Sequence, residues 1–396
     1  MDKTTDTDRL AHCKTLLAEL IAFPTVSSEG NRALTEYLAA HLHDIGAKVW
    51  TEPDATGDKL NLFATIGPDC DGGVILSGHT DVVPVTDQPW SSDPFEMSER
   101  DGRLFGRGTC DMKGFVAACV TMAPEFVRRK LKVPIHFAFT YDEEIGCFGA
   151  QALTASLLRR GIKPAAAIIG EPSSMKVIDG HKGCFEYTTW FTGLEGHGSA
   201  PDRGVNAIEY AARYMMKLVE LREALKARAP ENCPFDPPHT TINMGMLTGG
   251  VAHNVIPGKA RLDWEMRPVQ PADAAFVKAE LEQLVQGELL PEMRKKHSAA
   301  DICTDIVAEV AGLLPEHKNP ARDLVMAVTG ENDAGLVPFG TEAGLFQSIS
   351  IPSVICGPGS IAQAHKPDEY LDVAQLSLCL KMLGRLGQRL ETGPLM

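Results

Sequence analysis

Apolar residues recur at helical spacing near the start of the chain, which predicts amphipathic helices over 8–23 and 31–46. Asp8 or Thr7 is the expected cap of the first helix, and Gly46 is the expected end of the second. Short apolar runs then alternate with further helical patterns. The predicted strands are 48–52, 61–67, 74–77, 133–141 and 164–170, and the predicted helices are 112–129 and 148–161. This alternation predicts an α/β fold, in which a mixed, mostly parallel sheet has helices on both faces.

The pattern changes after about residue 181. Strand-like and helical segments now follow in βαββαβ order, at 183–193, 203–225, 240–250, 260–268, 273–286 and 299–312. That order is typical of a ferredoxin-like α+β unit. From about 316 the chain returns to helix, strand and helix, which could complete the first sheet. We therefore expect a catalytic α/β domain formed by 1–181 and 316–396, with a smaller domain, 182–315, inserted into it.

The composition narrows the class of protein. The chain has 396 residues, 44% of them hydrophobic, and a formal net charge of −14. This acidity and the lack of a basic stripe argue against nucleic acid or an anionic membrane as a partner. No apolar run is long enough for a membrane helix, and the first residues do not form a secretion signal. The ten cysteines include no C-x-x-C pair, so we expect reduced thiols in a cytoplasmic protein.

Imidazole and carboxylate side chains stand where strands are predicted to end or helices to begin. In a parallel sheet such ends gather at one edge, so these side chains could converge. Any one of these side chains would be ordinary in a turn or on an acidic surface. The hypothesis of a shared site depends on the ordered set as a whole. The candidate ligands are His79, Asp111, Glu144, Glu171 and His365.

Two imidazoles and three carboxylates suit zinc, cobalt or manganese. Five ligands are too many for one tetrahedral catalytic zinc, but they suit two ions that share a carboxylate, roughly 3.5–4 Å apart. Glu143 is then free to take a proton from bridging water. Asp81, two residues after His79, could fix the orientation of that imidazole from outside the coordination sphere. A nucleotide site has no support, because the chain lacks both a G-x-G-x-x-G segment at its first helix and a P-loop lysine.

Five segments resemble a known family, in order along nearly the whole chain. They are "SGHTDVVPV", "GRGTCDMKGF", "YDEEIG", "IIGEPS" and "GHGSAPDRGVNAIE". The family is that of the dizinc amidohydrolases, which includes acetylornithine deacetylases, succinyl-diaminopimelate desuccinylases, aminoacylases and glutamate carboxypeptidases. The resemblance implies two Zn²⁺ ions per subunit, which Co²⁺ could replace.

The resemblance also implies a role for each matching residue. His79, Asp111 and Glu171 would hold one zinc ion. Asp111 would bridge to the second ion, which Glu144 and His365 would complete. Glu143 would act as general base and then as general acid, and Asp81 would orient His79.

Further roles fall on the inserted domain, which forms the homodimer and a lid in the family. His197 matches a histidine that enters the partner's active site and stabilises the oxyanion. Asn254 and Arg267 match residues that bind the substrate carboxylate.

Within the family, three segments look most like acetylornithine deacetylases. They are "WSSDPFEMSERDGRLFGRGTCDMKGF", "GTEAGLF" and "GPGSIAQAHKPDEYL". The implied reaction is hydrolysis of N2-acetyl-L-ornithine to acetate and L-ornithine, in arginine biosynthesis, by metal-bridged hydroxide. Glu342 is a candidate partner for the side-chain ammonium group of that substrate. The alternatives are a succinyl-diaminopimelate desuccinylase, a broader N-acyl-amino-acid amidohydrolase or dipeptidase, and a non-catalytic binding protein on the same fold.

Overall fold

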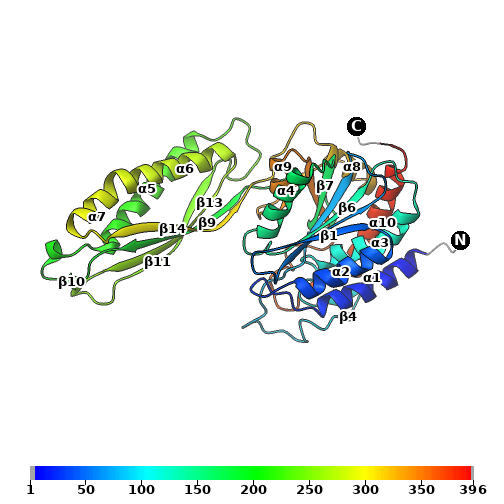
Figure 1. The fold of residues 1–396 in the computed structure, drawn as a ribbon, viewed down its shortest axis with the longest axis horizontal. Helices are drawn as coiled ribbons and strands as arrows, with labels where there is room; N and C mark the ends of the chain where they lie inside the picture. The colour runs from blue at the N-terminus through cyan, green and yellow to red at the C-terminus, as the bar shows by residue number, and fades with distance from the viewer. Residues whose placement is uncertain (1–4, 394–396) are drawn as a thin grey trace. The chain divides into compact units, whose positions relative to one another are not determined.

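An eight-stranded sheet is the centre of the first of two units in this computed structural model, which describes residues 5–393 (Figure 1). The first unit contains the described residues up to Gly180, then Pro315–Val337, and those from Thr341 onward. The second unit contains His181–Leu314 and Pro338–Gly340.

The large sheet has the strand order β1-β2-β6-β3-β7-β16-β8-β15. Its middle strands, β6, β3, β7 and β16, are parallel neighbours, whereas β1 and β2 pair in antiparallel fashion at one side. The strand bounds are β1 Lys48–Pro53, β2 Leu60–Ile66, β3 Val74–His79, β6 Ile135–Thr140, β7 Ala166–Pro172, β8 Ile178–Gly180, β15 Gly335–Leu336 and β16 Ser353–Gly357. The predicted α/β class with a mixed, mostly parallel sheet is confirmed.

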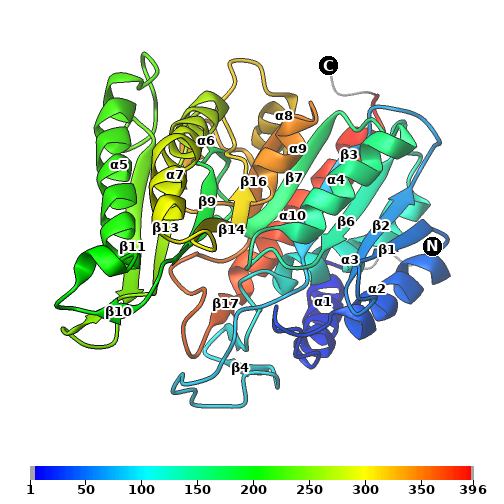
Figure 2. The ribbon, with the colours of Figure 1, turned by 60° about the vertical axis from the view of Figure 1, so that its left-hand side comes forward.

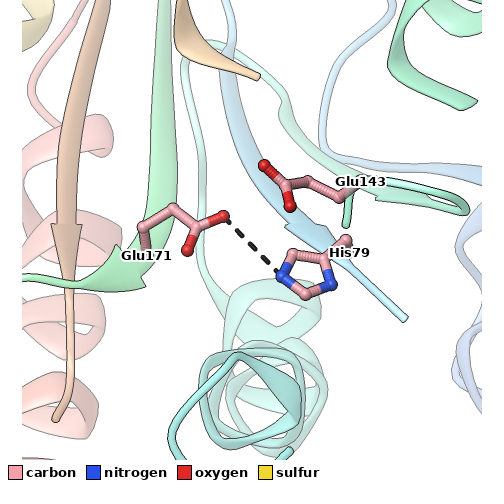
Figure 3. A group of neighbouring side chains, drawn as sticks. All are labelled: His79, Glu143 and Glu171. Carbon is pink, nitrogen blue, oxygen red and sulfur yellow. Dashed lines mark ion pairs between the residues drawn. The ribbon is translucent and has the colours of Figure 1, made fainter. Parts of the chain in front are cut away.

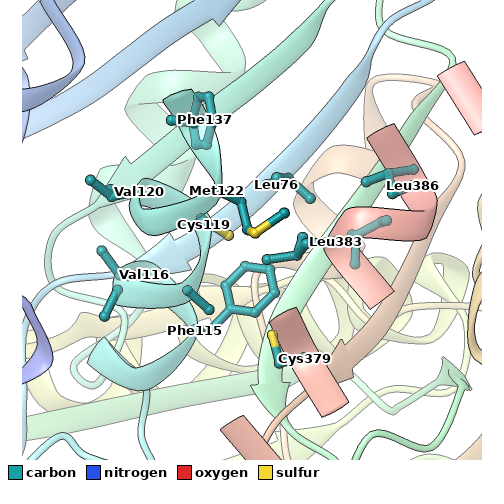
Figure 4. Close-up of a cluster of buried hydrophobic side chains, with 14 of the residues drawn as sticks. Leu76, Phe115, Val116, Cys119, Val120, Met122, Phe137, Cys379, Leu383 and Leu386 are labelled. Atoms are coloured by element: carbon teal, nitrogen blue, oxygen red, sulfur yellow. The ribbon is translucent and has the colours of Figure 1, made fainter. Parts of the chain in front are cut away.

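Helices cover both faces of this sheet (Figure 2). They are α1 Asp6–Ile21, α2 Arg32–Asp44, α3 Lys113–Arg128, α4 Phe148–Arg160, α8 Pro320–Thr329, α9 Ala343–Ser348 and α10 Val373–Leu390. Helix α3 is apolar all round because it lies between the sheet and the helices α1 and α10. Figure 4 shows Phe115 and Met122 of α3 together with Leu76 of β3 and Leu383 of α10 in this core.

The start of α1 differs from the sequence prediction. The N-cap is Thr5, and neither Thr7 nor Asp8 has that role. Asp8 is instead the third helical residue of a capping box. The Thr5 hydroxyl accepts the N–H of Asp8 at 3.2 Å, and the Asp8 carboxylate accepts the N–H of Thr5 at 3.1 Å.

The second unit has a four-stranded antiparallel sheet with the order β11-β13-β9-β14. With α5 between β9 and β11, and α6 between β13 and β14, this is the predicted ferredoxin-like order. Tyr187, Tyr214 and Trp264 lie in the core between the sheet and the helices. The bounds are β9 Cys184–Thr192, α5 Ala207–Ala227, β11 Thr241–Gly249, β13 Lys259–Arg267, α6 Pro271–Leu284 and β14 Asp301–Val310.

Several short elements were not predicted. A π-helical turn, Val285–Leu289, joins α6 to a further helix, α7 Leu290–Lys296. The remaining short elements are the strands β4 Ser98–Arg100, β5 Arg103–Phe105, β10 Gly196–His197, β12 Val255–Ile256 and β17 Tyr370–Asp372, and the 3₁₀ turn Pro201–Arg203. Strands of two or three residues are too short to show a hydrophobic period, so the sequence carries no signal for them.

Two global expectations can be compared with the described residues. None of the helices in residues 5–393 has the length and apolar character that a membrane span requires. All ten cysteines are free thiols.

Candidate metal centre

The candidate ligands come together at the edge of the sheet where the parallel strands end. His79 is the last residue of β3, and Glu171 is the next-to-last residue of β7. The turn after β6 carries Glu144, and the loop after β16 carries His365. Asp111 reaches the same edge from just before α3. Carboxyl ends of neighbouring parallel strands share one edge, which is why segments far apart in sequence meet here.

Asp111 lies between the two imidazoles. Its Oδ1 is 3.1 Å from Nε2 of His79, and its Oδ2 is 3.3 Å from Nε2 of His365. The same His365 nitrogen is 3.0 Å from Oε2 of Glu144. One carboxylate thus faces both imidazoles, as a bridging ligand must.

Glu171 and Glu143 also lie beside His79 (Figure 3). Oε1 of Glu171 is 3.7 Å from Nε2 of His79. Two overlapping groups could each hold a metal ion, because their ligand atoms lie within 4.8 Å of one another. One group is His79, Glu143 and Glu171, and the other is His79, Asp111 and Glu144.

The crowding of carboxylates disfavours their charged forms. Burial, with the nearby charge of Asp111, raises the pKa of Glu144 to about 7. The same causes raise the pKa of Glu171 well above its ordinary value, and burial does the same for the pKa of Glu143. A divalent cation would relieve this repulsion, since a cation favours the ionised form of each neighbouring carboxylate.

The pKa values of Asp111 and of the two imidazoles shift in the direction that favours the charged form of each group. Burial acts to raise the pKa of Asp111, but hydrogen bonds with His365 and His79 outweigh it and hold that pKa well below its ordinary value. Hydrogen bonds to Asp111 and Glu144 raise the pKa of His365 to about 10. The carboxylates of the cluster thus favour the protonated forms of the imidazoles.

Asp81 contacts His79 in a different way from the one expected. Nδ1 of His79 is 2.9 Å from the main-chain oxygen of Asp81, whereas the Asp81 carboxylate is 3.5 Å away. That carboxylate instead accepts the N–H groups of Glu143 at 3.1 Å and Glu144 at 3.4 Å, and the Ser27 hydroxyl at 2.6 Å. Asp81 therefore fixes the His79 ring through its main chain and the Glu143–Glu144 turn through its side chain.

His197 and Asn254 lie together in the second unit. His197 is in β10, which pairs with β12 directly after Asn254, and the Gly198 N–H donates to the Asn254 oxygen at 2.7 Å. Nδ1 of His197 accepts the N–H of Ser199 at 3.2 Å and lies 2.8 Å from the Ser199 hydroxyl oxygen. A nitrogen that accepts a hydrogen bond carries no proton, so this contact favours the tautomer with the proton on Nε2.

Arg267 does not lie near this pair. It is the last residue of β13, while Asn254 precedes the start of that strand. The eight intervals between the nine residues of β13, at about 3.4 Å each, place Arg267 about 27 Å from the start of that strand. The Arg267 guanidinium donates to Glu265 at 2.6 Å.

Glu342 is buried, with 1% of its surface exposed. Its carboxylate accepts hydrogen bonds from the hydroxyls of Thr140 and Ser77, on β6 and β3. These contacts tie the start of α9 to the sheet beneath the cluster. The predicted contact of Glu342 with a substrate ammonium group stays a prediction.

A buried ion pair beside the cluster was not predicted. It joins Nη1 of Arg107 to Oε2 of Glu369 at 2.7 Å. Glu369 stands next to Asp368, and nothing in the sequence distinguishes the buried acid from the adjacent one.

Comparison with known proteins gives consistent results. Peptidase family M20/M25/M40 matches residues 75–389. An acetylornithine deacetylase from Proteus mirabilis is 35% identical over 382 residues, covering 94% of this chain and 95% of the relative.

Two solved structures are similar in fold. One is an M20 family metallo-carboxypeptidase from Sulfolobus solfataricus, with a TM-score of 0.73 at 17% identity, covering 96% of this chain and 99% of that chain. The other is a dinuclear metal-binding M20 peptidase from Bacillus subtilis, with a TM-score of 0.64 at 18% identity and 98% coverage of both chains.

Proposed function

Because this chain belongs to peptidase family M20/M25/M40 and is one of its metallohydrolases, we propose that it hydrolyses N2-acetyl-L-ornithine to acetate and L-ornithine. The observation that supports this choice of substrate is the 35% identity to an acetylornithine deacetylase over 94% of the chain. The reaction would serve arginine biosynthesis.

The cluster fits a pair of divalent metal ions. Among the described residues, Oε1 of Glu171 is buried without a hydrogen-bond partner, although buried polar atoms are normally satisfied. Carboxylate and imidazole donors suit zinc, and cobalt could replace it. A metal ion would provide the missing partner of Glu171 and offset the repulsion among the carboxylates.

We assign His79, Asp111 and Glu171 to one Zn²⁺, and Asp111, Glu144 and His365 to the other. Asp111 is shared because its two oxygens face the two imidazoles. When bound, the ions would lower the pKa of a water molecule and polarise the scissile carbonyl group.

Glu143 supplies the proton transfers. Burial raises its pKa above the ordinary value, which makes its carboxylate a stronger base for accepting a proton and returning it. The carboxylate takes a proton from the attacking water and then gives it to the leaving nitrogen, so that acetate and a free amine are produced. The hydrogen bond from the Glu143 N–H to Asp81 holds the start of this turn in place.

His197 stabilises the oxyanion by donating from Nε2. We propose that it acts on the partner's site in a homodimer built on the second unit. The geometry of one chain supports this arrangement, because Arg267 and the His197–Asn254 pair lie at opposite ends of β13. A small N-acyl amino acid cannot span about 27 Å, so residues from both ends can contact one substrate only if two subunits contribute them.

Turnover of a substrate panel tests the proposal. The panel contains N2-acetyl-L-ornithine, N-succinyl-L,L-diaminopimelate, other N-acyl amino acids and dipeptides, with free amine measured before and after chelation and on addition of zinc or cobalt. We expect the highest kcat/KM for acetylornithine, and loss of activity on chelation. A tenfold preference for another member of the panel would transfer the assignment to a desuccinylase, a broader amidohydrolase or a dipeptidase. Activity that survives complete removal of metal would refute the metal assignment.

A further inference from the structure

A buried carboxylate organises the main chain that leads into Asp111. Glu369 is 1% exposed, and each of its oxygens accepts two hydrogen bonds. Oε1 accepts the N–H groups of Cys110 at 2.9 Å and Asp111 at 3.1 Å. Oε2 accepts the N–H of Gly108 at 3.1 Å and Nη1 of Arg107 at 2.7 Å. Four donors converge on this side chain, so the path of the chain before Asp111 depends on it.

The arginine of this pair extends the network to the other end of the cluster. Arg107 is also 1% exposed, and its Nη1 donates to the main-chain oxygen of Lys366 at 3.3 Å. Its Nη2 donates to Oε1 of Gln88 at 2.5 Å. Gln88 in turn donates from Nε2 to the main-chain oxygen of His365 at 3.1 Å. Two adjacent carbonyl groups, those of residues 365 and 366, are thus held by one network.

His365 needs such support. Its φ is +62°, in the left-handed region that a residue with a side chain rarely adopts and in which the main chain is strained. Its side chain is 52% exposed, so packing does little to fix it. Hydrogen bonds to its own carbonyl and to the next one hold the main chain in this conformation.

A buried ion pair is poorly explained by stability alone, because apolar side chains of similar volume often stabilise a core as well or better. The Arg107–Glu369 pair instead connects two segments that carry candidate ligands. We propose that Glu369, Arg107 and Gln88 form a brace that positions Asp111 and His365 for metal binding. This rests on the proposed function, in which both residues are metal ligands. The three residues are positioning residues, since none of them is assigned to contact metal or substrate.

Glu369→Gln tests the brace. The substitution keeps the size of the side chain and removes its charge and one of its acceptor oxygens. The matched control is Asp179→Asn, which makes the same kind of change in another buried carboxylate of the first unit, paired with Arg322 at 3.0 Å. Each protein is stripped of metal and titrated with Co²⁺ against a chromophoric chelator, and the visible spectrum of bound Co²⁺ reports the ligand geometry. Circular dichroism and melting curves report the fold.

We expect folded Glu369→Gln to bind Co²⁺ about 10- to 100-fold more weakly than the parent chain, with altered visible bands. Asp179→Asn should melt earlier but bind Co²⁺ like the parent. A folded Glu369→Gln protein with parental affinity and spectrum would overturn the proposal, even if its melting temperature were lowered. A loss of affinity of similar size in Asp179→Asn would also overturn it, because the effect would then be general destabilisation.

If Glu369→Gln does not fold, the same Co²⁺ titration of Gln88→Ala tests the brace. Gln88 is only half-buried, so its replacement should leave the fold intact. Weaker binding of one of the two ions supports the brace, and unchanged binding of both overturns it. A parent chain that binds no Co²⁺ would refute the proposed function and the brace together. A parent chain that binds two ions but prefers another substrate would refute only the substrate assignment.

Discussion

The metal-free protein should lose stability relative to the zinc-loaded protein as the pH rises from about 5 to 8. The reason lies in the buried carboxylates of the cluster. Glu144 has a pKa near 7 in the folded protein, against an ordinary value of 4.5. Between these values the folded state holds a proton that the unfolded state has released, so stability falls as the pH rises through this window.

The size of the effect follows from the shift. A rise in pKa from 4.5 to about 7 corresponds to about 3 kcal/mol at 1.36 kcal/mol per unit, all of it lost above pH 7. The raised pKa values of Glu143 and Glu171 act in the same direction. His365 also does so, because its pKa is raised from 6.5 to about 10 and its stabilising charge is lost as the pH rises through the folded value. The lowered pKa of Asp111 has no influence above pH 5, where this group is ionised in both states.

Calorimetry of the chelated and the zinc-loaded protein at pH 5, 6, 7 and 8 measures this dependence. About 3 kcal/mol should lower the melting temperature of the metal-free first unit, relative to the zinc-loaded one, by roughly 5–10 °C between pH 5 and 8. The gain on adding zinc should grow over the same range. Metal-free Glu144→Gln should show a shallower pH dependence, because its amide does not titrate. Burial lowers the pKa of His136 and of His181 to about 4, which raises stability up to about pH 6.5 in both forms, so the metal-free protein is compared with the zinc-loaded one. A metal-free melting temperature that does not fall relative to the zinc-loaded one over this range would refute the reasoning.

Three further substitutions test separate parts of the site. Glu143→Gln should keep two bound metal ions, measured by elemental analysis, but lose about 10²- to 10⁴-fold in kcat, and near-parental turnover would contradict its role as base. His197→Ala should also be inactive with metal retained. Mixing it with Glu143→Gln under subunit exchange should restore about a quarter of the parental activity, since half of the dimers would have one complete site. No recovery would argue against a contribution across subunits. Asp81→Asn should lower the free energy of unfolding by about 1–3 kcal/mol and lower kcat, because it puts an amide donor against main-chain N–H groups. The hydrogen bond between the main chain of residue 81 and His79 would remain. An unchanged kcat would show that Asp81 does not fix the Glu143 turn.

Helices and strands with a strong pattern of apolar residues were predictable from the sequence. The parallel strands β3, β6 and β7 are near-continuous apolar runs, and the polar residues that follow each run therefore stand out at the strand ends. This is why the sequence alone predicts His79 and Glu171 at one edge of the sheet. The short strands β10 and β12, which hold the His197 hairpin together, gave no such signal.

Contacts that depend on main-chain atoms were not predictable. The sequence indicates that Asp81 follows His79, but not that the carbonyl oxygen, rather than the carboxylate, faces the imidazole. The four hydrogen bonds on Glu369 join positions about 260 residues apart, and three of their donors are peptide N–H groups that every residue type provides. A network of this kind leaves no pattern in the side chains of either segment.

On the proposed assignment, Glu143 separates an enzyme from a binding protein built on the same fold. Five other residues of the cluster would hold the two cations, so a protein that only bound metal would not need Glu143 as a further carboxylate. The charge of Glu143 adds to the repulsion that raises the pKa of Glu171, and burial disfavours its own ionised form. Such a residue lowers stability in the metal-free state, and departures of this kind from a well-satisfied interior are typical of functional sites. With the metal ions assigned to the other five residues, proton transfer during hydrolysis gives a physical reason for a carboxylate at this position.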